Sequence, residues 1–173
     1  MYAGVGKSDW EINLGLDNNI FCFNVESTAE LEVINTLASQ RNKVANVAFR
    51  INPNIGAHTH ANITTGLAEN KFGIAMDDLE KTIEISTRLK NISVIGLHFH
   101  IGSQILDMDD FKALSNRIND LQCRLKQHGI VLPNINVGGG LGINYEHPDI
   151  EPIPDFAGYF STLSLIHISE PTR

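Results

Sequence analysis

A run of glycines follows a short strand-like segment in the last third of the chain. Gly138-Gly139-Gly140-Leu141-Gly142 comes directly after residues 135–137. Backbone amides without Cβ atoms can turn together toward an anion, as they do in phosphate-binding loops. The run has neither the Gly-Lys-Ser/Thr of a Walker loop nor the third spaced glycine of a dinucleotide fingerprint. A phosphate-binding loop and a tight turn both remain open.

A pair of histidines ends the strand predicted over residues 92–100. His98 and His100 are alternate residues, so they share one face of the strand. They could ligate a metal, joined by His58 and His60, as in barrel hydrolases. Alternatively, one imidazole stacks on a flat cofactor while Ser103 binds its phosphate, or the pair is structural.

A guanidinium lies at the end of another predicted strand, residues 44–52. Arg50 could clamp a carboxylate or lie beside a cofactor ring, and a surface salt bridge is the alternative. The polar connection over residues 53–70 is too long for a routine βα turn and is typical of a binding loop or lid. It closes on Lys71-Phe72-Gly73, where we expect a solvated lysine.

Strands and helices alternate along the chain. Ser8 with Glu11, and Ser27 with Glu30, form two capping boxes that each predict a helix start. Further helices are predicted over residues 77–90 and along an apolar face that stops at Gly129, and strands over residues 20–25, 44–52, 92–100 and 135–137. This alternation predicts an α/β fold with a parallel sheet, either doubly wound or closed into a barrel. In both cases the polar strand ends build one shared site.

Composition narrows the class of partner. The 173 residues are 42% hydrophobic, which suits one domain with a substantial core. A net charge of -7 disfavours nucleic acid and anionic membranes as partners, and no apolar run approaches the roughly 20 residues of a membrane span. No signal-peptide pattern is present, so we expect a cytoplasmic protein with a small-molecule site. Cys22 and Cys123 are expected to be buried free thiols.

The last eleven residues differ in character from the rest. Residues 163–173 resemble the translation of a transposase-type sequencing adapter. We therefore expect a native domain over residues 1–162 and a non-native tail over residues 163–173.

Seven motifs together, in order and spacing, resemble the diaminopimelate decarboxylases. They are Phe23-Asn-Val-Glu-Ser27, Arg50-Ile-Asn-Pro53, Thr59-His60, Thr65-Gly66, Lys71-Phe-Gly73, His98-Phe-His-Ile-Gly-Ser-Gln104 and Asn136-Val-Gly-Gly-Gly-Leu-Gly142. The resemblance runs from about residue 2 to residue 160. Ornithine and arginine decarboxylases share the histidine and glycine motifs, whereas the motifs from Thr65 to Gly73 are specific to the diaminopimelate branch.

The resemblance implies a pyridoxal 5'-phosphate (PLP) enzyme with a (β/α)₈ barrel of the alanine-racemase type and a C-terminal β domain, acting as a homodimer. Its cofactor serves as the electron sink when an amino-acid substrate loses CO₂, converting meso-diaminopimelate to L-lysine. By position, His100 would stack on the pyridine ring, Ser103 and Gly138, Gly139 and Gly140 would hold the phosphate, and Arg50 would lie close to the ring.

Some family motifs do not occur in this sequence. The cofactor-binding lysine of a Tyr-Ala-x-Lys-Ala-Asn-like motif would precede residue 1, and Lys7 is not its counterpart because it follows a later strand. A Glu-Pro-Gly-Arg-like motif would follow residue 162, and the Cys and Tyr motifs of the dimer interface are missing too. We therefore expect an internal fragment holding the middle strands of the barrel, poorly soluble and inactive alone.

Two other activities stay open at this stage. One is another basic amino-acid or carboxynorspermidine decarboxylase, which shares the PLP chemistry. The other, from a different class, is a metal-dependent barrel hydrolase that uses His98 and His100.

Overall fold

The computed structural model describes residues 1–55, 72–143, 145–147 and 155–167. These residues belong to two compact units. The sheet unit consists of Met1–Asn52, Lys71–Phe99 and Leu132–Val137. The helix unit consists of Pro53–Asn70, His100–Val131 and Gly138–Arg173.

All strands of the sheet unit run parallel. They are β1 (Phe23–Val25), β2 (Ala45–Asn52), β3 (Ile74–Ala75), β4 (Ile92–His98) and β5 (Asn134–Asn136). The sheet order is β1-β2-β4-β5, β3 pairs with the end of β2, and Tyr2 adds a parallel bridge to Phe23. Neighbours in the sheet therefore follow chain order, as in a barrel, whereas a doubly wound sheet reverses its order at a switch point. The order favours the barrel, which periodicity alone left open.

The four predicted strands are all present, and each has shifted ends. The first begins at Phe23 rather than residue 20, and the histidine-bearing strand ends at His98 rather than residue 100. The two-residue strand β3 has no sequence signal of its own, because it forms only by pairing with Ile51 and Asn52 of β2.

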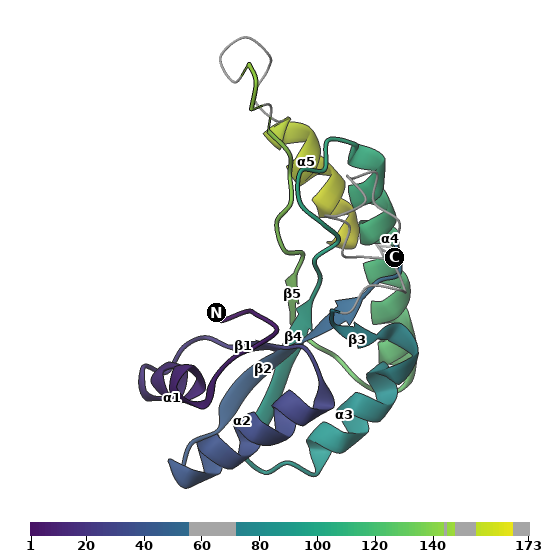
Figure 1. Ribbon diagram of the computed structural model, residues 1–173. Coiled ribbons are helices and arrows are strands. Elements are labelled where there is room, and N and C mark those ends of the chain that lie inside the picture. The colour runs from purple at the N-terminus through teal and green to yellow at the C-terminus, as the bar shows by residue number, and fades with distance from the viewer. Residues whose placement is uncertain (56–71, 144, 148–154, 168–173) are drawn as a thin grey trace. The chain divides into compact units, whose positions relative to one another are not determined.

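Three helices belong to the sheet unit: α1 (Asp9–Asp17), α2 (Thr28–Gln40) and α3 (Leu79–Thr87). The helix α2 contacts β1, β2, β4 and α1, while α3 contacts α2 and β4 (Figure 1). The predicted helix over residues 77–90 is shorter than expected, because its acidic start forms the 3-10 turn η1 (Met76–Asp78) and its helical part ends at Thr87.

One of the two capping boxes is complete and the other is diverted. At the start of α1, the Ser8 amide donates to Glu11 Oε2 at 2.9 Å, as the box predicts. At the start of α2, Ser27 Oγ accepts from the Glu30 amide at 3.2 Å, but the Glu30 carboxylate does not return to Ser27. It accepts instead from the Glu26 amide at 2.7 Å and pairs with Lys7, a partner distant in sequence.

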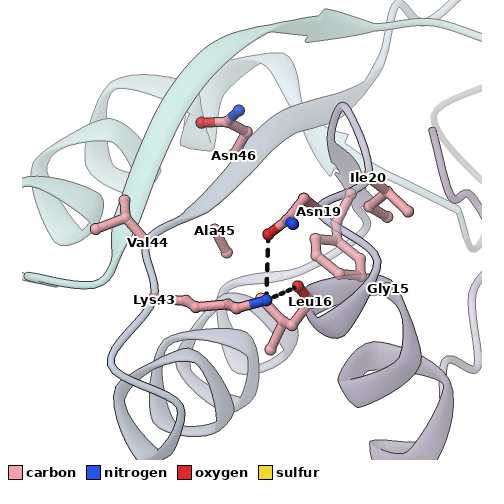
Figure 2. A pocket seen from close by; sticks show the side chains of 9 residues that line it. Gly15, Leu16, Asn19, Ile20, Lys43, Val44, Ala45 and Asn46 are labelled. Carbon is pink, nitrogen blue, oxygen red and sulfur yellow. Dashed lines mark hydrogen bonds between the residues drawn. The ribbon is translucent and has the colours of Figure 1, made fainter.

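A lysine closes the C-terminal end of α1. Lys43 Nζ donates to the carbonyl oxygen of Leu16 at 2.6 Å and to Asn19 Oδ1 at 3.1 Å (Figure 2). A longer contact of 3.4 Å reaches the carbonyl of Asp17. Cations are favoured at helix C-termini, where carbonyl groups lack helical partners. A cavity of about 300 Å³ opens beside this contact. Lys43 lies two positions before β2, so it ties the C-terminal end of α1 to the segment that leads into that strand.

The helix unit contains α4 (Met108–Gln127), α5 (Phe156–Ser164) and the 3-10 turn η2 (Leu165–His167). The apolar face predicted for α4 is buried, and Gly129 follows the helix with φ +74°. Phe111 packs edge-on against Tyr159 of α5, with ring centroids 4.9 Å apart. The sequence analysis did not predict α5. The helix α5 ends at Ser164, and both α5 and the following turn η2 pack on α4. The non-native origin of residues 163–173 stays a prediction.

The two cysteines differ in burial. Cys22 is buried as expected, and burial raises the pKa of its thiol. The expectation is wrong for Cys123, which is exposed on α4. It lies two positions from the buried Leu121 and Leu125, which places it off the apolar face of the helix. Among the helices in the described ranges, none has the length and apolar character needed to cross a bilayer.

We predict that Gly96→Ala destabilises the sheet. A Cβ at Gly96 would lie well inside 3.0 Å of the Asn134 carbonyl oxygen, so the pairing of β4 with β5 would have to yield. The expected cost is about 1 to 3 kcal/mol in the free energy of unfolding, measured by urea denaturation of a protein that contains this chain. Gly6→Ala, whose added Cβ meets nothing within 4 Å, is the matched control. Equal stability of both variants would contradict the prediction.

Candidate functional site

Two loops of the helix unit pair with each other. One comprises residues 101–106, after β4 in the chain, and the other residues 138–143, after β5; together we call them the loop pair. The Ile105 amide donates to the Gly140 carbonyl at 2.8 Å, and the Gly142 amide donates to the Ile105 carbonyl at 2.8 Å. Ile105 and Leu141 form a parallel bridge, and Ile105 is fully buried. The loop pair is therefore a short two-stranded ladder.

Glycine is required where the two loops touch. Gly140 has φ +105°, and a Cβ there would lie well inside 3.0 Å of the Gly102 carbonyl oxygen. Gly138 has φ +75° and Gly102 has φ +154°, conformations that other residues rarely adopt. At Gly139, by contrast, an added Cβ would meet nothing within 4 Å, and the residue is exposed. The glycine run thus combines a tight backbone contact with an open segment.

A glutamine that the sequence analysis did not single out fastens the loop pair. Gln104 adopts φ +58°, an uncommon value for a residue with a side chain. Its Oε1 accepts from the Ile143 amide at 2.9 Å, and its Nε2 donates to the Ile143 carbonyl at 3.4 Å. The side chain therefore extends the ladder by one rung. Its position next to Ser103 was the only sequence signal, because its partner lies 39 residues away.

The loop pair brings several predicted site residues together. Ser103 is exposed and lies between Gly102, which touches Gly140, and Gln104, which is bonded to Ile143. His100 is half-buried and precedes Ser103 by three residues in the same unit. A hydroxyl group and backbone amides thus share one loop pair, an arrangement that suits a phosphate.

Arg50 belongs to the sheet unit, at the register position on β2 that pairs with His98 of β4. Its Nη1 lies 3.0 Å from both carboxylate oxygens of Glu26, and its guanidinium carbon lies 5.6 Å from the centroid of the Phe72 ring. Only 11% of the Arg50 side chain and 7% of the Glu26 side chain are exposed. Arg50 is therefore a buried ion-pair partner, which rules out the surface salt bridge and leaves it oriented by a carboxylate and a ring.

The remaining histidines are the ones that the sequence offers as metal ligands. His98 is buried, with 6% of its surface exposed, at the end of β4. His58, His60 and Lys71 lie outside the described residues. Within the part of the chain that is described, no group of three His, Cys, Asp or Glu residues is placed to hold a metal ion.

Comparisons with known proteins identify the family. The family "pyridoxal-dependent decarboxylase, pyridoxal binding domain" matches residues 1–164. The chain belongs to this family. The diaminopimelate decarboxylase of Bacteroides thetaiotaomicron is 66% identical over 162 residues, which are 94% of this chain and 42% of that protein. The chain thus spans less than half the length of this relative.

Solved structures agree with the sequence match. Diaminopimelate decarboxylase from Helicobacter pylori, in complex with L-lysine, is 39% identical with a TM-score of 0.81, covering 94% of this chain and 41% of that one. The Methanocaldococcus jannaschii enzyme, also with L-lysine, is 37% identical with a TM-score of 0.83 over 95% of this chain and 38% of that one. Lysine decarboxylase from Selenomonas ruminantium, 18% identical with a TM-score of 0.72 over 98% of this chain and 40% of that one, shares the fold. The predicted partial PLP-binding barrel is confirmed.

The loop pair fits the phosphate of a pyridoxal cofactor. A Cβ at Gly140 would force the two loops apart, while the open position at Gly139 leaves space over the backbone. Both properties are those of a loop that receives an anion on its amides. The family match, rather than the missing ligand cluster, argues against the metal-dependent hydrolase.

We predict that Gly140→Ala weakens PLP binding by about 10-fold or more, about 1.4 kcal/mol in binding free energy. The added methyl group cannot coexist with the Gly102 carbonyl, so the loop pair must open. Fluorescence titration of a full-length protein carrying this segment measures the dissociation constant, with Gly6→Ala as control. Unchanged PLP affinity in Gly140→Ala would show that the close contact is dispensable.

Gln104→Leu is expected to give a smaller effect. The substitution keeps the size of the side chain and removes both hydrogen bonds to Ile143. Each such bond contributes about 0.5 to 1.5 kcal/mol, so we expect PLP binding to weaken by about 3- to 10-fold. Gln104→Glu cannot donate to the Ile143 carbonyl and adds a negative charge beside the proposed phosphate site, so it should lose at least as much affinity as Gln104→Leu. PLP affinity in Gln104→Leu equal to that of Gly6→Ala would contradict the role given to the side chain.

Proposed function

We propose that this chain supplies part of the PLP-binding barrel of a diaminopimelate decarboxylase, which converts meso-diaminopimelate to L-lysine and CO₂. The observation that carries the proposal is the 66% identity over 162 residues to the Bacteroides thetaiotaomicron enzyme. The L-lysine bound in the Helicobacter pylori and Methanocaldococcus jannaschii relatives supports the same product.

Each predicted site residue has a separate task in this proposal. The amides of Gly138, Gly139 and Gly140 and the hydroxyl of Ser103 bind the phosphate, which anchors the cofactor. The imidazole of His100 packs on the pyridine ring and fixes its plane. Arg50 lies near the ring, with its charge balanced by Glu26. When bound, PLP withdraws electrons from the substrate carbon that loses CO₂.

Orientation is the contribution of this chain to the reaction. A ring with one face covered by His100 presents its other face to the substrate, and a correctly oriented substrate reacts as if it were at high local concentration. The loop pair can supply such rigidity, because backbone pairing and the Gln104 side chain both join its loops. A buried ion pair, rather than a mobile cation, occupies the Arg50 position.

The second candidate is another basic amino-acid or carboxynorspermidine decarboxylase. It uses the same cofactor and the same cradle, so the residues of this chain suit it equally. Identity favours the diaminopimelate enzyme, at 66% against 18% for the Selenomonas ruminantium lysine decarboxylase. We also propose a homodimer, as the resemblance implies, and a cytoplasmic location, which the two free thiols support.

A chimaera tests the function directly. The matched 162-residue segment of the Bacteroides thetaiotaomicron enzyme is replaced by the corresponding residues of this chain, without the tail of residues 163–173. We expect the chimaera to bind PLP and to release CO₂ from meso-diaminopimelate with a kcat/KM within about 10-fold of the parent enzyme. A panel of ornithine, arginine, lysine and carboxynorspermidine should react far more slowly.

The controls separate folding from function. The unmodified relative sets the reference rate, and the chimaera with Gly6→Ala sets the background effect of a substitution in this segment. A folded chimaera that binds no PLP, or that prefers another substrate of the panel, would overturn the proposal. Light scattering measures the mass of the chimaera in solution, and a fully active monomer would overturn the proposed homodimer.

A further inference from the structure

The side chain of Lys7 is buried in the sheet unit, while the residue as a whole is half-buried. The Lys7 side chain has an exposure of 0%, although lysine is rarely buried without partners. Its Nζ donates to the carbonyl oxygens of Gly4 at 2.7 Å and Asn24 at 2.6 Å, and to Glu30 Oε1 at 2.5 Å. An ammonium group has three protons, so these acceptors satisfy all of them. The same nitrogen lies 5.7 Å from the centroid of the Tyr2 ring.

The partner of this lysine also holds the backbone that leads out of β1. While Oε1 of Glu30 pairs with Lys7, its Oε2 accepts from the Glu26 amide at 2.7 Å. The second capping box is diverted for this reason: the buried cation holds the carboxylate at a place from which it reaches Glu26 instead of Ser27. Lys7 therefore fixes the backbone of Glu26 through one intermediate side chain.

Glu26 in turn orients Arg50. Both carboxylate oxygens of Glu26 lie 3.0 Å from Arg50 Nη1, and Phe72 lies against the guanidinium. Cations and carboxylates thus alternate from Lys7 to Glu30, then through Glu26 to Arg50, all within one compact unit. The Glu30 side chain is 14% exposed, so every member of the series is largely screened from solvent.

Stability is a weak explanation for such a series. Buried ion pairs lose much of their attraction to the cost of removing charges from water, and apolar residues of similar size often replace them without loss. The series does fix the positions of these side chains, because each charged group pairs with one group of opposite charge and little water is present to replace that partner. Without Lys7, Glu30 would keep an uncompensated charge and would gain by turning toward water, which would release the Glu26 amide.

We propose that Lys7 is a positioning residue for Arg50, and that it acts on cofactor binding through Glu30 and Glu26 without touching the cofactor. The inference rests on the proposed function, in which Arg50 lies near the pyridine ring. Lys7 contributes no chemistry of its own, since its three protons are engaged.

The test uses the chimaera and measures PLP affinity by fluorescence titration, below the melting temperature of every variant. The variants are Lys7→Met, Arg50→Met and the double variant. The matched control is Lys43→Met, which removes a different structural lysine, one whose Nζ binds a carbonyl at the C-terminal end of α1. We expect Lys7→Met to weaken PLP binding by about 5-fold and Arg50→Met by at least as much. The double variant should bind no more weakly than Arg50→Met alone, because both substitutions act on one group.

Several results would overturn the inference. A Lys7→Met variant whose PLP affinity changes no more than that of Lys43→Met would leave Lys7 a purely structural role. Multiplying effects in the double variant would show that Lys7 acts independently of Arg50. If Lys7→Met does not fold, Glu30→Gln replaces it, with the same expected 5-fold loss (about 1 kcal/mol) and the same comparison in the Arg50→Met background. An unmodified chimaera that binds no PLP would instead overturn the proposed function, and this inference with it.

Discussion

The contact between Gly140 and the carbonyl oxygen of Gly102 is the constraint on which the candidate site depends. A side chain at Gly140 would separate the two loops, and with them Ser103 and the glycine amides. Backbone pairing through Ile105 and the side chain of Gln104 then hold the loops together on either side of this contact. The glycines therefore have two consequences: they allow the loops to meet at Gly140, and at Gly139 they leave open space where a side chain would stand. A tight turn alone would require only the first.

In the sheet unit, the important contacts are ion pairs between buried charged side chains. Lys7 and Arg50 are both removed from water, and each is matched by a glutamate, Glu30 and Glu26. Removing one partner from a buried ion pair lowers the free energy of unfolding by about 3 to 5 kcal/mol. Substitution of a single partner is therefore poorly tolerated, even where the pair adds little net stability. Lys43, two positions before β2, has a different role, since its Nζ binds the carbonyl of Leu16 at the end of α1 and Oδ1 of Asn19 (Figure 2). The geometry around Arg50 is thus tied to residues that no local pattern connects to it.

Local sequence patterns predicted most helices and strands, whereas contacts between residues far apart in the sequence could not be predicted. Periodicity and capping gave the strands, the start of α2 and the buried face of α4, because these depend on neighbours in sequence. The two-residue β3, the rung between Gln104 and Ile143, and the diverted Glu30 each depend on a partner far along the chain, so no local signal announced them. Cys123 was misplaced because a free cysteine was treated by residue type and not by its angle on the helix. The site residues were found through motifs, whose spacing reports the family more clearly than any single residue does.

The central claim is that the loops after β4 and β5 form one phosphate cradle. A crystal structure of the full-length chimaera with PLP tests it most directly. We expect phosphate oxygens within about 3.2 Å of Ser103 Oγ and of amides in the run Gly138 to Gly140, with the Gly102 to Gly140 contact unchanged. A phosphate bound elsewhere, with the loop pair intact and empty, would contradict the account.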